Sequence, residues 1–272
     1  MPGDAVYFVS DAHFSARDSA HEREKRERFS RFLAGVAAEG AERLYVVGDL
    51  FDFWFEYRRV VPAGFGDILH ALRRLRDAGT GVTLIGGNHD YWLGEHLARD
   101  WDFDLSPDGL VAEHQGRRLR VDHGDETLSS DRGYLALKAV IRNPVFLGAA
   151  RLVHPDLTFW LADRLSHGSR WLDEKQMEQG RQGRPLRLKA VLNEDFDALI
   201  LGHLHLGFHL RYSRWEILCL GDWILRFSYA RLVEGQLTLM NDAGLTVPVE
   251  TVDDPDRPPH CRLRPRPGAE GR

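Results

Sequence analysis

Cysteine is scarce in this sequence, since Cys219 and Cys261 are the only two among 272 residues. Two cysteines are too few for a disulfide framework, and they fit a reducing compartment. Neither belongs to a Cys-x-x-Cys pair. The sequence therefore gives no sign of a zinc site built from cysteine.

Long apolar runs and an excess of positive charge are also missing. No stretch approaches the roughly 20 apolar residues of a transmembrane helix, and the first residues lack the basic and apolar regions of a signal peptide. Lys and Arg number 36 against 41 Asp and Glu, which gives a net charge of −5 and a pI near 6.2. We therefore expect a cytoplasmic protein with no nucleic acid as its partner. The oligomeric state stays open.

Apolar residues are plentiful enough for a sizeable core, at 43% of the sequence. The length favours one large domain, or one domain with an insertion. We assign residues 1–252 to this domain. Residues 253–272 hold five prolines and almost no apolar residues, so we expect a disordered tail there.

Short apolar runs alternate with helical patterns in the first part of the chain. Residues 5–9, 44–47 and 82–85 are typical of buried strands. Segments 21–36 and 66–78 carry apolar residues at helical spacing. This order of strands and helices predicts a parallel sheet.

The second half of the chain is rich in strand patterns. Residues 110–116 and 118–121 alternate as in a hairpin, and residues 198–201 are typical of a buried strand. Four more alternating segments follow, at 208–212, 215–220, 223–232 and 235–240. From these segments we expect a second, largely antiparallel layer.

Side chains that can bind metals directly follow five of the predicted strands. They are Asp11 and His13, Asp49, Asn88, His123, and His203 with His205. In open α/β sheets, ligands collect beyond the carboxyl ends of the strands. The members of each pair stand two residues apart, so in extended backbone they point the same way. A single histidine at a strand end is usually structural, but five such motifs together indicate a metal site.

Seven oxygen and nitrogen ligands exceed what one catalytic zinc ion requires, and they indicate two ions that share one carboxylate. Asp49, a lone carboxylate in a tight glycine turn, is the expected bridge. Ligands of this mixed kind without thiolate suit Mn²⁺ first, with Fe²⁺ or Zn²⁺ as alternatives. Two ions about 3.5–4 Å apart can clamp the attacking and leaving oxygens of a displacement at phosphorus. We therefore predict phosphoester or phosphoanhydride hydrolysis by a metal-bound hydroxide.

The candidate catalytic residues are the bridging Asp49 and, beside the ligands, His89. It follows Asn88 and precedes Asp90, and a carboxylate beside an imidazole can fix its tautomer and raise its pKa. His89 could then protonate the leaving oxygen or hold the phosphoryl group. The alternative is that His89 only packs.

The order of the motifs resembles that of the calcineurin-like metallophosphoesterase superfamily. From residue 11 to residue 205 the chain reads Asp-x-His, Gly-Asp-x-x-Asp, Gly-Asn-His-Asp, His-Gly-Asp and Gly-His-x-His. The resemblance implies an α/β fold, an α/β/β/α sandwich of two mixed sheets flanked by helices. It also implies two ligand sets that share Asp49: one with Asp11, His13 and His205, the other with Asn88, His123 and His203.

Within the superfamily, the chain is similar to the UDP-2,3-diacylglucosamine pyrophosphatase family of lipid A biosynthesis. The similarity rests on residues 48–52 with the aromatic residues after them, on residues 123–134, and on a helical insertion before residue 202. It implies cleavage of the pyrophosphate of UDP-2,3-diacylglucosamine to give 2,3-diacylglucosamine 1-phosphate (lipid X) and UMP. It further implies substrate contacts from Asn88, His89, Asp131, Tyr134 and His203. Well-studied members of that family have Arg at the position of His89, whereas the wider superfamily has His there, as this chain does.

The insertion, residues 126–191, has a helical pattern and many aromatic residues. It holds 11 Lys and Arg against 7 Asp and Glu, a charge of +4, so the rest of the chain carries −9. The resemblance implies a lid over acyl chains, and the basic charge predicts peripheral binding to the anionic inner face of the cytoplasmic membrane. A solvated charged face is the ordinary alternative. For the aromatic patch at 51–57, core packing is the ordinary explanation.

Two other functions remain open at this point. A soluble phosphodiesterase or nucleotide pyrophosphatase of the same superfamily would use the same metal site, but it has no need for a long aromatic and basic lid. A non-catalytic scaffold would be expected to have lost ligands, and all seven are present.

Overall fold

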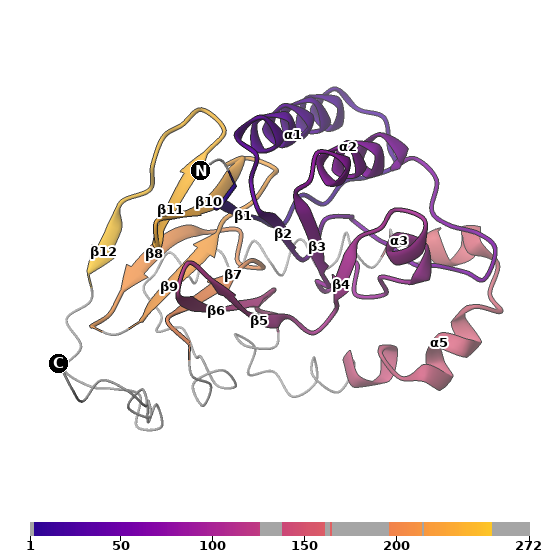
Figure 1. The fold of residues 1–272 in the computed structure, drawn as a ribbon. Coiled ribbons are helices and arrows are strands. Elements are labelled where there is room, and N and C mark those ends of the chain that lie inside the picture. The colour runs from indigo at the N-terminus through magenta and orange to yellow at the C-terminus, as the bar shows by residue number, and fades with distance from the viewer. Residues whose placement is uncertain (1–2, 126–137, 161–163, 165–195, 214, 252–272) are drawn as a thin grey trace.

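The computed structural model describes residues 3–125, 138–160, 164, 196–213 and 215–251 (Figure 1). Most of the expected lid, including Asp131 and Tyr134, lies outside the described residues, and so does the expected tail. Within the described ranges, no helix is both long and apolar enough to cross a membrane.

The first sheet has six strands in the order β11-β10-β1-β2-β3-β4. The strands β1 to β4 are parallel to one another, while β10 and β11 continue the sheet antiparallel beyond β1. Their bounds are β1 Val6–Val9, β2 Arg43–Val47, β3 Gly81–Ile85, β4 Asp104–Ser106, β10 Ser228–Val233 and β11 Gln236–Asn241. All four residues of β1 are buried, as in a strand covered on both faces.

The second sheet also has six strands, in the order β12-β8-β9-β7-β6-β5. It contains the predicted hairpin, since β5 and β6 pair antiparallel, and β7 lies parallel to both β6 and β9. The bounds are β5 Leu110–His114, β6 Arg117–Asp122, β7 Ala198–Leu201, β8 Gly207–Arg211, β9 Glu216–Leu220 and β12 Val249–Thr251.

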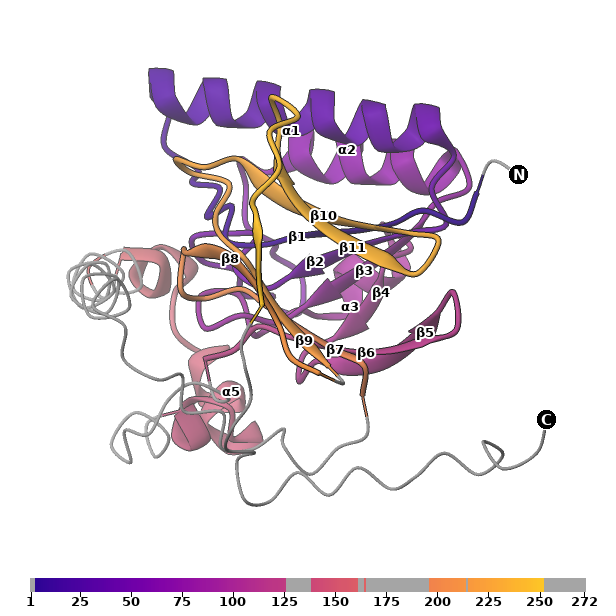
Figure 2. The same cartoon turned by 90° about the vertical axis from the view of Figure 1, so that its left-hand side faces the viewer.

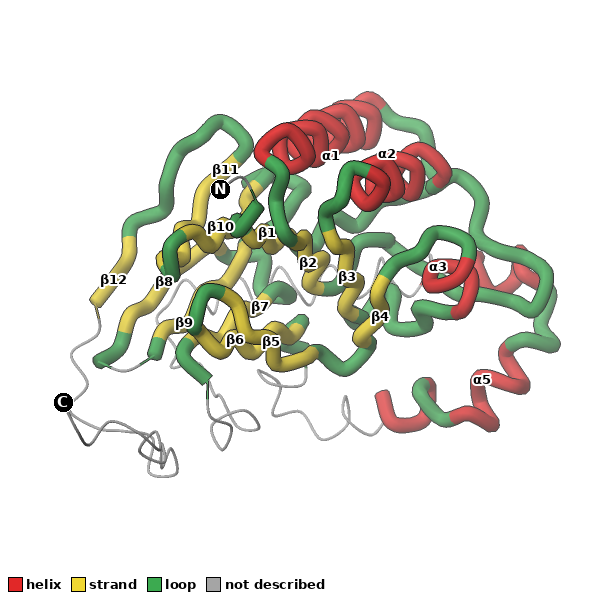
Figure 3. The backbone as a smooth tube through the Cα atoms, in the orientation of Figure 1, coloured by secondary structure: helices red, strands yellow, loops and turns green. Residues whose placement is uncertain are grey.

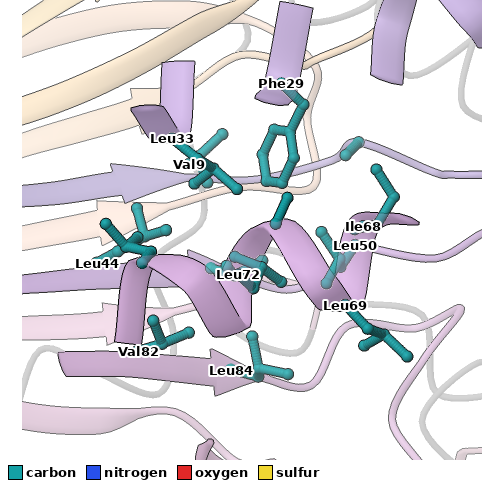
Figure 4. Packing of buried hydrophobic residues seen from close by; sticks show 14 of the residues in the cluster. Val9, Phe29, Leu33, Leu44, Leu50, Ile68, Leu69, Leu72, Val82 and Leu84 are labelled. Carbon is teal, nitrogen blue, oxygen red and sulfur yellow. The ribbon is translucent and has the colours of Figure 1, made fainter. Parts of the chain in front are cut away.

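Two helices, α1 (Ala20–Glu39) and α2 (Gly66–Asp77), cover the outer face of the first sheet (Figures 1 and 3). The α1 helix begins after Ser19, whose hydroxyl accepts a hydrogen bond from the backbone N–H of Glu22 at 3.0 Å. It ends at Gly40, which has the left-handed φ of 69° that favours glycine. Figure 4 shows helix side chains packed against strand side chains, among them Phe29, Leu33, Leu72, Val9, Leu44 and Val82.

A second core lies between the two sheets. Val6, Phe8 and Val47 of the first sheet meet Leu119, Ile200 and Leu218 of the second. Figure 2 shows the resulting layers of helices, first sheet and second sheet. Two shorter helices, α3 (Glu95–Arg99) and α5 (Pro144–Ala150), lie on the right in Figure 1. The fold is therefore the predicted one, two mixed sheets flanked by helices.

Two predictions about the C-terminal strands were wrong. The segment 223–232 is not one strand, because the Asp222 carboxylate accepts hydrogen bonds from the backbone N–H groups of Ile224, Leu225 and Arg226 and holds a turn there. The C-terminal strands also do not form one antiparallel layer. Strands β8 and β9 join the second sheet, whereas β10 and β11 cross back to pair with β1.

Candidate active site

The structure brings all seven candidate ligands to one edge of the sandwich. They stand after the carboxyl ends of β1, β2 and β3 in the first sheet and of β6 and β7 in the second. They are Asp11 and His13, Asp49, Asn88, His123, and His203 with His205. Both sheets therefore contribute to the same site.

The backbone of these loops is not extended, which corrects the expectation for the two pairs. Five of the seven residues have left-handed φ values: Asp11 53°, His13 44°, Asp49 52°, His203 68° and His205 53°. Their side chains converge because the chain turns sharply at each strand end. Non-glycine residues with such angles are uncommon, and they cluster at functional sites where surrounding contacts hold them.

Glycines in the motifs allow the ligand loops to approach one another. A Cβ on Gly87 would lie 2.0 Å from Oδ1 of Asp49, and a Cβ on Gly202 would lie 2.6 Å from Oδ2 of Asp11. A Cβ on Gly48, whose φ is +79°, would lie 2.3 Å from Nδ1 of His123. Any side chain at these three positions would displace a candidate ligand.

One group of candidate ligands gathers around Asp11. Nε2 of His205 lies 3.4 Å from Oδ1 of Asp11, and Nε2 of His13 lies 3.9 Å from the same oxygen. Nε2 of His13 also lies 3.4 Å from Oδ2 of Asp49. This nitrogen is buried and forms no hydrogen bond within the described part of the chain. An unpaired buried nitrogen between two carboxylates fits a metal ligand better than a structural histidine.

A second group lies on the other side of Asp49. Nε2 of His123 lies 3.4 Å from Oδ2 of Asp49, and Oδ1 of Asn88 lies 3.1 Å from both Nε2 of His123 and Nδ1 of His203. Nδ1 of His123 donates a hydrogen bond to the carbonyl of Val47 at 3.0 Å, which leaves Nε2 directed at the site. Asp49 therefore touches both groups through one oxygen, as expected of a bridging carboxylate.

The site is electrostatically coupled. Burial raises the pKa of Asp49, but His123, His89 and His13 outweigh burial and hold it well below its usual range. Burial lowers the pKa of His13, yet Asp49, Asp11 and Asp52 raise it to about 10. Burial likewise raises the pKa of Asp11, but His205 and His13 outweigh burial and lower it, although Asp11 and Asp49 are almost fully buried. Buried carboxylates that stay ionised are suited to a divalent cation.

His89 lies at the same site, but the expected role of Asp90 was wrong. The Asp90 carboxylate accepts hydrogen bonds from the backbone N–H groups of Asp49, Phe51 and Gly87, and so holds the loops together. Nδ1 of His89 instead donates to the backbone carbonyl of Asp52 at 3.0 Å. The backbone N–H of His89 donates to Oδ1 of Asp49 at 2.9 Å. A ring nitrogen of His89 also lies within 4.8 Å of atoms of His13 and Asp49 that could bind metal.

Two residues at the base of the insertion were missed by the sequence reasoning. Lys138 forms a buried ion pair with Asp125, two residues after His123. Asp125 belongs to the His-Gly-Asp motif and could have been singled out there, but no local pattern identifies Lys138 as its partner. The aromatic patch at 51–57 is mostly core, as expected, since Phe51, Trp54 and Phe55 are buried.

The described part of the insertion, residues 138–160, packs against the loops of the site. The ring centroids of Phe53 and Phe159 are 5.1 Å apart, and the Tyr57 hydroxyl donates to Oγ1 of Thr158 at 2.7 Å. Nε1 of Trp92 donates to the carbonyl of Ile141 at 3.2 Å. These contacts hold the described part of the insertion beside the loops that carry the candidate ligands.

Carboxylate, amide and imidazole groups gathered at the strand ends of a two-sheet sandwich are the arrangement expected of a metal-dependent hydrolase. Residues 5–207 match the family model "Calcineurin-like phosphoesterase", so the chain belongs to this family and is a hydrolase. The family implies divalent metal ions, and the structure holds candidate residues for them.

Among its curated relatives is a protein of Porphyromonas gingivalis named UDP-2,3-diacylglucosamine hydrolase. It is 34% identical over 244 residues, which cover 83% of this chain and 92% of the relative. A protein of the same name from Neisseria gonorrhoeae is 28% identical over 254 residues, which cover 90% of this chain and 98% of the relative. Among solved structures, the phosphoesterase Yfce from E. coli has a TM-score of 0.47 and 16% identity, over 90% of this chain and 97% of that one.

Proposed function

We propose that this hydrolase cleaves the pyrophosphate bond of UDP-2,3-diacylglucosamine to give lipid X and UMP. The observation that carries the proposal is the convergence of all seven candidate ligands on one edge of the sandwich, in a chain that aligns with 92% of a relative named for this substrate. The lipid substrate distinguishes this function from that of a soluble phosphodiesterase or nucleotide pyrophosphatase of the same family.

Two divalent ions would be held by the two groups of ligands that share Asp49. One group is Asp11, His13, Asp49 and His205; the other is Asp49, Asn88, His123 and His203. The unpaired Nε2 of His13 and the shared oxygen of Asp49 support this assignment. Mn²⁺ is the first choice among the metals, with Fe²⁺ or Zn²⁺ next. When bound, the ions would activate water and neutralise charge on the phosphoryl group.

The remaining chemistry belongs to His89 and the residues around it. The carbonyl of Asp52 holds the proton of His89 on Nδ1, so Nε2 is left for the substrate. His89 would orient the phosphoryl group or protonate the leaving oxygen. Asn88, His89 and His203 would contact the substrate, together with Asp131 and Tyr134, which lie outside the described residues.

The insertion would act as a lid over the acyl chains, within one domain at 1–252. Of the thirteen large apolar side chains that are exposed in the described part of the chain, seven lie between residues 140 and 160. They are Val140, Val145, Phe146, Leu152, Val153, Leu157 and Trp160. A soluble substrate has no need of such a surface, whereas a lipid substrate and an anionic membrane face would cover it. We therefore place the enzyme at the inner face of the cytoplasmic membrane.

Product analysis tests the proposal. The protein is stripped of metal with a chelator, reloaded with Mn²⁺ and incubated either with UDP-2,3-diacylglucosamine or with soluble nucleotides. We expect lipid X and UMP from the first substrate, no activity before reloading, and little product from the nucleotides. Equal turnover of the nucleotides would favour the soluble-substrate enzyme. Full activity after chelation would exclude the metal mechanism.

A further inference from the structure

A cavity of about 600 Å³ opens between the loop after β2 and α3. Its lining comes from residues 56–61, from Glu95, His96, Arg99 and Asp100, and from Arg151 of the insertion, and it contains none of the seven candidate ligands. Figure 1 shows α3 and α5, which ends beside Arg151, on the same side of the molecule. The volume is in the range of small-molecule sites, about 300–1,000 Å³.

Glu56 joins the two segments that line this cavity. The carboxylate of Glu56 is buried and accepts hydrogen bonds from the backbone N–H groups of Gly94, His96 and Leu97. A Cβ at Gly94 would lie 2.2 Å from Oε2 of Glu56, so the loop and α3 are in close contact. These bonds satisfy the Glu56 carboxylate within the protein.

The cavity has a surplus of arginine. Arg58, Arg59, Arg99 and Arg151 line it. Arg99 is paired with Glu95 at 2.9 Å, and the third lining carboxylate, Asp100, lies 2.7 Å from Nδ1 of His96.

The other three guanidinium groups have no such partner, since Arg58, Arg59 and Arg151 form no ion pair with a described residue. The N–H of Tyr57 donates to the carbonyl of Val60 at 3.0 Å, which places Arg58 and Arg59 at the tip of a tight turn. Guanidinium groups without an ion-pair partner are suited to binding a phosphate group.

Exposed aliphatic side chains follow these three arginines in the chain, of which Arg151 also donates from Nε to the carbonyl of Glu56 at 3.4 Å. Val60 and Val61 follow Arg58 and Arg59 and are 49% and 38% exposed. Leu152 and Val153 follow Arg151 and are 89% and 40% exposed. A site for a soluble anion gains nothing from these side chains, because water solvates them poorly. A lipid headgroup site gains from them, because acyl chains begin directly beyond the phosphate.

We propose that this cavity, the arginine pocket, binds the phosphate headgroup of an anionic phospholipid and seats the protein on a bilayer. Arg58, Arg59 and Arg151 contact the phosphate, and the four aliphatic side chains enter the layer below the headgroups. The inference extends the membrane association within the proposed function to a particular site, and it does not depend on which substrate is hydrolysed.

Vesicle flotation tests the pocket. The full-length, Mn²⁺-loaded protein is mixed with vesicles of phosphatidylcholine alone or of phosphatidylcholine with phosphatidylglycerol. The test variant is Arg58→Gln/Arg59→Gln. The matched control is Arg31→Gln/Arg74→Gln, which removes the same charge from exposed positions on α1 and α2. Hydrolysis of a small chromogenic phosphodiester checks that both variants are folded.

We expect the unaltered protein and the control to bind only the anionic vesicles. The pocket variant should bind them roughly 10-fold or more weakly, because each basic side chain near an anionic surface adds to the attraction. Equal weakening in both variants would show delocalised charge, and no weakening in either would show that the pocket is not used. Calorimetry with inorganic phosphate tests a third possibility. If the pocket variant loses phosphate binding but binds vesicles as well as the unaltered protein does, the pocket is a site for soluble anions. Each of these three results overturns the proposal.

The flotation assay contains no UDP-linked lipid. Pocket-dependent vesicle binding without formation of lipid X would therefore leave this inference standing and reject the proposed substrate. If lipid X forms but all variants bind vesicles equally, the proposed substrate stands and the arginine pocket is rejected as the membrane site.

Discussion

Asp49 is the residue that links the two groups of candidate ligands. Its Oδ2 lies 3.4 Å from both His13 and His123, its Oδ1 accepts the backbone N–H of His89, and its backbone has a φ of 52°. A non-glycine residue in this conformation costs on the order of 1 kcal/mol or more, which surrounding contacts must offset. Strain and ligand geometry therefore coincide at one residue.

The first prediction follows from that position. Asp49→Ala should remove both ions and lower kcat by several orders of magnitude, because the shared carboxylate is lost from both ligand groups. His205→Ala is the matched comparison, since His205 contacts only the Asp11 group, and it should lose about half of the metal. Metal-to-protein ratios from plasma mass spectrometry measure both outcomes. A full metal content in Asp49→Ala would contradict the bridging role.

The second prediction separates catalysis from metal binding at His89. His89→Asn should lower kcat by roughly 10²–10⁴-fold, as expected when a group that transfers a proton or holds charge is removed. The metal content should not change, because the backbone N–H that contacts Asp49 is retained. Steady-state kinetics and metal analysis on the same preparation check this. If the variant loses metal, His89 is a ligand, as its closeness to His13 and Asp49 also allows.

At the scale of elements, the insertion is attached to the core at separate points. Lys138 pairs with Asp125, Trp92 donates to the carbonyl of Ile141, and Phe159 packs on Phe53. The contacts on the core side come from the loops after β2, β3 and β6, the same loops that carry Asp49, Asn88 and His123. The described part of the insertion, residues 138–160, therefore packs on the loops that carry the candidate ligands, and it contains none of the seven itself.

The third prediction concerns this insertion. Replacing residues 140–191 by a short flexible linker should raise KM steeply for UDP-2,3-diacylglucosamine, since each CH₂ left uncovered costs about 0.8 kcal/mol. Lys138 is retained so that its buried pair with Asp125 stays intact. Hydrolysis of a small phosphodiester should persist, because the candidate ligands stand on the strand ends. KM and kcat on both substrates measure these effects, with metal content and circular dichroism as controls for folding. Equal losses on both would mean that the insertion only supports the fold.

At the scale of the whole molecule, the second sheet of the sandwich contains a buried charge network that includes none of the candidate ligands. Glu216 of β9 is 3% exposed and contacts Nε2 of His209 at 2.8 Å, Nη1 of Arg117 at 2.5 Å and Arg211 at 3.3 Å. Burial raises the pKa of Glu216, but His209 and Arg117 outweigh burial and lower it to about 2. Arg117 belongs to β6 and His209 to β8, so the network links three strands of the second sheet.

The fourth prediction is a pH dependence of stability. The folded pKa of Glu216 is below its ordinary value of 4.5, so ionised Glu216 stabilises the fold above pH 4.5, and this contribution is lost as the pH falls towards 2. Glu216→Gln should lower the free energy of unfolding by about 3 kcal/mol at pH 7 and by much less near pH 2. Urea unfolding of both proteins at several pH values measures this difference in the free energy of unfolding.

Glu113→Gln is the control for that experiment, because Glu113 is 75% exposed on β5 of the same sheet. It should change the stability little at any pH, as is usual for exposed ion pairs. If Glu216→Gln and Glu113→Gln show the same pH profile, the buried network does not contribute to acid stability.

The sequence by itself determined most of the strands, the order of the motifs and the seven candidate ligands. These signals are local: an apolar run predicts a buried strand, and a polar residue after its last position lies at the strand end. The glycines at 48, 87 and 202 were equally visible, although only the packed structure shows which ligand each one makes room for. The resemblance then supplied the pairing of ligands around each ion, which spacing alone left open.

Only the tertiary structure decided which residues meet across the chain. Asp90 holds the backbone of Asp49 rather than the imidazole of His89, and β10 returns to pair with β1 rather than staying with β8 and β9. The arginine pocket likewise combines a turn after β2, the α3 segment and Arg151, which are far apart in sequence. Hydrophobic periodicity shows which face of each segment is buried. The partner of a polar side chain depends instead on which segments pack together, and the packing of the whole core decides this.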